Sequence, residues 1–125
     1  MPITCQELDV FKRPSAVVMT LKACGKLTKE DYEVFSAEFS RVSKAQEEVR
    51  LLILLEDFRG WTASALWEDV KFDAKHFNDV ERIAIVGDSS WAEAVTFLYK
   101  PFTNATVRYF DDLEIENARG WIMTP

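Results

Sequence analysis

The sequence contains one histidine, His76, and only two cysteines, Cys5 and Cys24. One imidazole cannot build a histidine-rich metal site, and a Ser-His-Asp triad would have to use His76 itself. The cysteines form no Cys-x-x-Cys pair, and two thiols cannot build the disulfide framework of a small secreted protein. We therefore expect no metal site and a reducing cytoplasmic environment.

An excess of basic residues and a long apolar run are also missing. The chain has 15 Lys and Arg against 21 Asp and Glu, a net charge of −6. An acidic domain repels phosphate backbones, so we expect no nucleic-acid partner. The longest aliphatic run, Leu51 to Leu55, is far shorter than the roughly 20 residues that span a bilayer, and Met1 to Glu7 does not resemble a signal peptide. The expected protein is cytoplasmic, with peripheral membrane contact as an open alternative.

Glycine and proline are scarce, with four of each scattered along the chain. No linker, repeat or low-complexity stretch interrupts the sequence, which predicts a single domain over residues 1–125. Hydrophobic residues make up 48% of the chain. A chain of this size buries about two-thirds of its unfolded surface, which is enough for a core without metal or disulfides.

Apolar periodicity predicts that strands and helices alternate. Runs of β-forming residues predict five strands, at 3–11, 16–23, 49–56, 82–86 and 106–110. Helical spacing and capping residues predict four helices, at Thr28 onward, 62–77, Ser90 to Pro101 and Asp111 to Trp121. The order β-β-α-β-α-β-α-β-α predicts an α/β fold, a mostly parallel five-stranded mixed sheet with an antiparallel first strand and four helices.

Two segments carry the clearest core signals. Residues 49–56 are apolar without alternation, as expected of a central parallel strand buried on both faces. In the helix that begins near Thr28, where Asp31 imitates a capping box, apolar residues recur at helical spacing. These stripe residues are Tyr32, Phe35, Phe39 and Val42. Gly25 is expected to end the second strand.

Polar loops follow two of the parallel strands. Ligands of such sheets bind beyond the carboxyl ends of the strands, here at 56–62 and 87–91. Glu56, Asp57 and Asp88 would oppose a phosphate, and neither loop has a nucleotide-binding motif, so we expect no cofactor. The same carboxylates could converge, but no nucleophile–base pair accompanies them. We therefore expect a protein that is not an enzyme.

Aromatic residues around the second and third predicted helices suggest a binding surface. Phe72 lies opposite the apolar stripe of its helix, with Lys71 and Lys75 beside it. Such a patch suits a lipid headgroup layer, a homodimer interface or simply a single exposed ring. Trp61 is either a hydrophobic staple on the second helix or, with Phe58 and Trp91, part of a pocket mouth.

Several segments together resemble the bacterial SpoIIAA-like family. They are Asp57-Phe58-Arg59-Gly60-Trp61, Ala65-Leu66-Trp67-Glu68-Asp69, Lys75-His76-Phe77, Glu81 to Asp88 and Val107 to Asp111. The resemblance covers nearly the whole chain. The family resembles the STAS (anti-sigma-factor antagonist) and CRAL-TRIO folds, which implies one antiparallel edge strand and four helices.

The resemblance implies two different functions. CRAL-TRIO domains bind lipids and other apolar molecules, which implies a hydrophobic ligand or a membrane surface as partner. The residues expected to bind it are Phe58, Trp61, Trp67, Phe72, Trp91 and Phe97. Anti-sigma-factor antagonists instead dock a protein partner and switch by phosphorylation of a serine in an Asp-Ser pair. That pair is absent at this position, so the alternative partner-binding residues are Arg59, Thr62 and Ser64.

Overall fold

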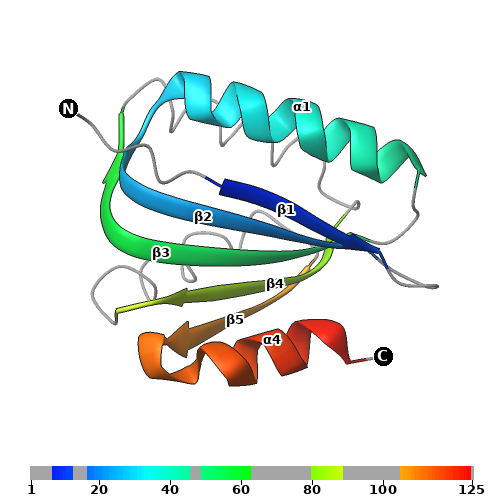
Figure 1. Ribbon diagram of the computed structural model, residues 1–125, viewed down its shortest axis with the longest axis vertical. Coiled ribbons are helices and arrows are strands. Elements are labelled where there is room, and N and C mark those ends of the chain that lie inside the picture. The colour runs from blue at the N-terminus through cyan, green and yellow to red at the C-terminus, as the bar shows by residue number, and fades with distance from the viewer. Residues whose placement is uncertain (1–6, 13–16, 46–48, 63–79, 89–104, 125) are drawn as a thin grey trace.

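The computed structural model describes residues 7–12, 17–45, 49–62, 80–88 and 105–124 (Figure 1). The strands are β1 (Glu7–Lys12), β2 (Val17–Leu27), β3 (Val49–Trp61), β4 (Val80–Gly87) and β5 (Thr106–Asp111). The helices are α1 (Lys29–Ala45), the 3₁₀-helix η2 (Asp112–Glu114) and α4 (Ile115–Met123).

The five strands form one sheet in the order β1-β2-β3-β4-β5. Strands β2 to β5 are parallel, and β1 pairs with β2 in the antiparallel sense. Helices α1 and α4 lie on opposite faces of the sheet (Figure 1). The α/β class with a parallel sheet, predicted from the alternation of elements, is thereby confirmed.

The helix count differs from the prediction. The described residues contain two α-helices, whereas the sequence predicts four. The other two expected helices, at 62–77 and from Ser90 to Pro101, fall almost entirely outside the described residues. Thr62 directly follows β3 and belongs to neither strand nor helix, and the residues after it lie outside the described part of the chain.

Two strands run further than predicted. β2 continues past Gly25, which was expected to end it, to Leu27. Gly25 takes a φ of 63° and the pairing of β2 with β3 shifts register on both sides of it, as in a β-bulge. β3 continues past Glu56 to Trp61 through Asp57 and Gly60, with φ values of 50° and 97°. Both strands continue through a bulge at positions where the apolar pattern of the sequence predicts a loop.

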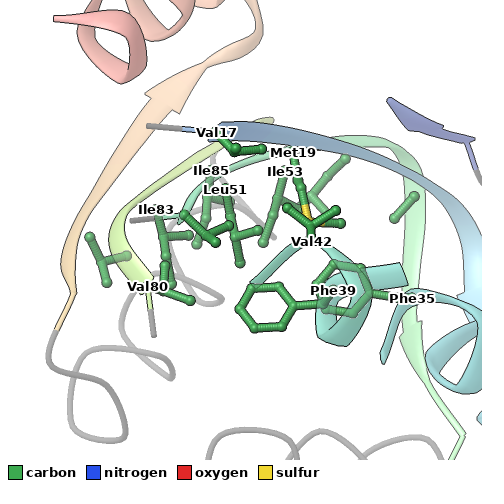
Figure 2. Packing of buried hydrophobic residues seen from close by; sticks show 14 residues of the cluster. Val17, Met19, Phe35, Phe39, Val42, Leu51, Ile53, Val80, Ile83 and Ile85 are labelled. Atoms are coloured by element: carbon green, nitrogen blue, oxygen red, sulfur yellow. The ribbon is translucent and has the colours of Figure 1, made fainter. Parts of the chain in front are cut away.

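The sheet separates two apolar clusters. On the α1 face, Phe35, Phe39 and Val42 are buried, which confirms these three members of the predicted stripe. Figure 2 shows them beside the aliphatic side chains of the sheet, among them Met19 and Ile53. The smaller cluster packs under α4 and is built from Val18, Leu52, Ala84, Val86, Phe110, Ala118 and Ile122.

Two further predictions are confirmed, the burial of the central strand on both faces and the capping box at the start of the first helix. Successive residues of β3, such as Leu51 and Leu52, belong to opposite clusters, so this strand is buried on both faces. At the start of α1, the Asp31 amide donates to Thr28 Oγ1 (3.3 Å) and the Thr28 amide donates to Asp31 Oδ2 (2.8 Å). This is a reciprocal capping box with Asp in place of Glu.

Candidate functional site

The carboxyl ends of β3, β4 and β5 meet at one edge of the sheet. We call this region the carboxyl edge. Its residues are Glu56, Asp57, Arg59, Thr62, Asp88, Asp111, Asp112 and Leu113. All are exposed except Thr62 and Asp111, which are half-buried. Asp57 is a non-glycine residue with positive φ, a conformation that Asp tolerates better than most side chains.

A capping box holds the turn from β5 into η2. The Leu113 amide donates to Asp111 Oδ1 (3.1 Å), and the Asp111 amide donates to Glu114 Oε1 (3.1 Å). These two bonds satisfy backbone donors that the start of a helix leaves without a partner. They also fix the backbone of Leu113, whose side chain is 95% exposed. The turn needs no apolar residue at this position, so the exposed leucine has no structural use in the described fold.

Carboxylates from the three strand ends act on Asp112. Loss of solvent around the carboxyl group raises the pKa of Asp112, and the carboxylates of Asp111, Asp88 and Glu56 raise it further. Lys22 balances part of this charge through an ion pair with Glu56 (Nζ to Oε2, 3.0 Å). The carboxyl edge attracts cations and repels phosphates.

The described segments contain neither a metal-binding cluster nor a membrane-spanning helix. No group of three His, Cys, Asp or Glu side chains in these segments could hold a metal ion. None of the described helices is long and apolar enough to cross a membrane.

A second polar cluster lies at the opposite end of the strands, under the end of α4. We call it the arginine cluster, formed by Arg50 of β3, Arg82 of β4 and Arg108 of β5. Arg50 Nη1 donates to the carbonyls of Ile122 (3.0 Å) and Thr124. Arg50 Nη2 also bonds Glu81 Oε1 (2.9 Å).

Arg82 holds the same helix end. Its Nη1 donates to the Trp121 carbonyl (2.9 Å) and to the carbonyl and Oγ1 of Thr124 (both 2.8 Å). The last carbonyls of a helix lack intrahelical partners and carry the negative end of its dipole, so two guanidinium groups suit them. Acidic residues suit the positive end of the same dipole, and Asp111 and Glu114 precede the start of α4.

The structure places the sequence-predicted residues unevenly. Arg59 and Thr62 lie at the carboxyl edge. Phe58 and Trp61 belong to β3 rather than to a loop. The remaining predicted site residues lie outside the described residues. They are Ser64, Trp67, Phe72, Trp91 and Phe97.

Sequence reasoning missed two features and misjudged a third. The signal for Leu113 was an apolar residue inside the acidic capping sequence Asp-Asp-Leu-Glu. The signal for the arginine cluster was an arginine in each of three strands. The expected reduced state is wrong for Cys24, which is disulfide-bonded, while Cys5 lies outside the described residues. Which residues of β1 lie beside the Cys24 end of β2 depends on the antiparallel register, which pairs Glu7 with Lys22. The spacing of the two cysteines in the sequence does not reveal that register.

Comparison with known proteins agrees with this fold. A family model described as SpoIIAA-like matches residues 18–123. One similar solved structure is that of an uncharacterized protein from the DUF3478 family with a SpoIIAA-like fold from Shewanella loihica PV-4. It is 26% identical in sequence, with a TM-score of 0.78 over 98% of this chain and 98% of that chain. No curated protein matches the chain.

Proposed function

The chain belongs to the SpoIIAA-like family, and from this premise we propose that it is a non-enzymatic, STAS-type interaction domain that docks a protein partner at the carboxyl edge. The observation that carries the proposal is the exposed Leu113 side chain, held by the capping box of Asp111 and Glu114. An apolar side chain on a fixed backbone can enter a partner's pocket with little loss of conformational entropy.

The surroundings of Leu113 define the partner's chemistry. Asp112, Asp88 and Glu56 make this edge acidic, so the partner carries a basic rim around an apolar pocket. Arg59, Thr62 and Ser64 complete the proposed docking surface at the end of β3 and beyond it. Because no Asp-Ser pair stands at 57–64, docking does not depend on phosphorylation there.

The substitution Leu113→Asp is expected to abolish partner capture while leaving the fold intact. Full burial of a leucine side chain is worth about 1.5–3 kcal/mol, and an added carboxylate would be desolvated in the partner's pocket. The measurement is affinity capture with quantitative mass spectrometry, using the wild type, Leu113→Asp and Val34→Asp as baits. Val34, on α1, is the matched control because it is the other exposed large apolar residue of the described chain (64%).

The comparison between the two variants decides the result. A protein retained by the wild type and by Val34→Asp, but lost with Leu113→Asp, supports docking at the carboxyl edge. Binding of that purified protein should also weaken with added salt, because the proposed rim is ionic. Identical captured proteins for all three baits would refute this surface.

We also propose a second function, the binding of an apolar or lipid-like ligand by a cytoplasmic protein that contacts membranes peripherally. Besides the resemblance to CRAL-TRIO domains, the support is the apolar composition of the α1 face of the sheet. From β3 to β5 that face carries a continuous apolar cluster. Its members on these strands are Val49, Leu51, Ile53, Leu55, Val80, Ile83, Ile85, Val107 and Tyr109. The proposed ligand contacts are Phe58, Trp61, Trp67, Phe72, Trp91 and Phe97.

For this second function, Phe72→Asp is expected to weaken ligand or liposome binding with little change in stability. Phe72 falls on the polar side of its predicted helix, so a charge there removes an apolar contact without disturbing the stripe. Native and denaturing mass spectra of the purified protein come first, since a bound ligand adds mass only in the native spectrum. Equal liposome binding by both proteins would remove Phe72 from the site, and a native dimer would make its patch an interface.

A further inference from the structure

The arginine cluster contains one guanidinium group whose N–H donors the described residues do not engage. Arg50 and Arg82 are directly paired across β3 and β4, and Glu81 lies between them. Like charges opposite each other destabilise a sheet unless other groups compensate. Here the compensation is Glu81 together with the carbonyls at the end of α4. These two arginines are therefore occupied by structural contacts.

Arg108 is different. Its side chain is exposed, and no hydrogen bond or ion pair joins its guanidinium to the described part of the chain. Instead it packs on two rings, with Cζ 4.9 Å from the Phe110 ring centroid and 5.1 Å from that of Trp121. Stacking on an aromatic face orients a guanidinium group while leaving its five N–H donors available. The side chain is thus held in place without its polar atoms being used.

The guanidinium groups of Arg82 and Arg108 lie close together although the protein is acidic overall. Arg82 Cζ lies 5.5 Å from the same Trp121 ring, so two guanidinium groups share one indole. The nearest acid on β5, Asp111, is three residues further along the strand, about 10 Å at the usual rise per residue. That is about one Debye length at physiological salt, so salt weakens the effect of the acidic carboxyl edge here.

We propose that Arg108, stacked on Phe110 and Trp121 with Arg82 on the same indole, binds the phosphate group of an anionic ligand. A planar guanidinium group matches two phosphate oxygens through parallel N–H bonds, and stacking lowers the entropic cost of that geometry. Arg82 contributes positive charge, while its Nη1 is taken by Trp121 and Thr124. The site is separate from the carboxyl edge and does not depend on the function proposed there.

The test is a titration with inorganic phosphate at constant ionic strength, followed by the NMR signals of the Trp121 indole and the arginine Nε–H groups. Wild-type protein is expected to saturate in the millimolar range. Arg108→Gln should weaken binding about tenfold or more, as loss of charge-assisted hydrogen bonds implies. Arg119→Gln is the matched control, because Arg119 is an exposed arginine of α4 and its loss removes the same charge.

A second arm distinguishes the source of the phosphate. Co-sedimentation with phosphatidylglycerol–phosphatidylcholine vesicles, but not with phosphatidylcholine alone, would identify a lipid headgroup if Arg108→Gln abolishes it. Phosphate binding without sedimentation would identify a soluble phosphorylated ligand. Arg108→Lys keeps the charge but loses the planar fork, so it should restore only part of the affinity. No saturable shift in the wild type, or equal affinity in Arg108→Gln, would overturn the proposal.

Discussion

Replacement of Arg50 by methionine is expected to lower the free energy of unfolding by about 3 kcal/mol. Arg50 is only 5% exposed and supplies donors to the Ile122 and Thr124 carbonyls and to Glu81. Methionine fills a similar volume but leaves these acceptors without their cation. Breaking a buried pair costs about 3–5 kcal/mol. Arg50 Nε is buried and has no hydrogen-bond partner among the described residues, so wild-type Arg50 already loses part of its hydration without compensation. We therefore expect a loss at the lower end of that range.

Urea denaturation measures this loss as a lower midpoint at an unchanged slope. The matched control is Arg41→Met on α1, where Arg41 bonds Glu38 in an exposed ion pair (Nε to Oε2, 3.2 Å). That hydrogen bond lowers the pKa of Glu38, yet the pair lies in solvent, so its removal should leave the midpoint within experimental error. Equal losses in the two variants would contradict the assignment of Arg50 as the clamp of α4.

Hydrogen exchange locates the effect. If Arg50 and Arg82 hold the end of α4, amides of α4 should lose protection in Arg50→Met before those of α1, because the two helices pack on opposite faces of the sheet. A uniform loss of protection would instead show that Arg50 stabilises the whole sheet.

The parts of the fold that followed from sequence are those in which burial repeats regularly. β3 was predictable because its apolar run leaves no polar face, and α1 because Phe35, Phe39 and Val42 recur at helical spacing after a capping pair. Both patterns are local. Each specifies its element without knowledge of any neighbour.

The parts that did not follow depend on contacts between distant residues. A glycine such as Gly25 is typical of a strand end. The pairing of β2 with β3 nevertheless continues past it, and Gly25 forms a bulge. Arg50 and Arg82 resemble interruptions of two apolar strands until α4 places three carbonyls beside them. Leu113 resembles an ordinary residue in the first turn of a helix. Its exposure to solvent becomes visible only in the folded structure.

The α1 stripe leads to the second large effect. Phe39→Ala is expected to lower the free energy of unfolding by about 4 kcal/mol, within the usual range for deleting a buried phenylalanine ring. Phe39 is fully buried, and its ring centroid lies 6.0 Å from that of Phe35. The substitution removes apolar contacts to the sheet and this ring pair together. The cavity left between helix and sheet cannot close without moving α1 (Figure 2).

Val34→Ala on the same helix separates packing from helix propensity. Val34 is largely exposed, and alanine favours a helix more than valine does, so this variant should be unchanged or slightly more stable. Phe39→Ala gains the same kind of propensity advantage and should still unfold at a much lower urea concentration. If the two variants unfolded at similar urea concentrations, α1 would be held by its own helical stability rather than by its stripe. The α1 face of the sheet would then be exposable at little cost, which would strengthen the apolar-ligand proposal over the carboxyl-edge docking site.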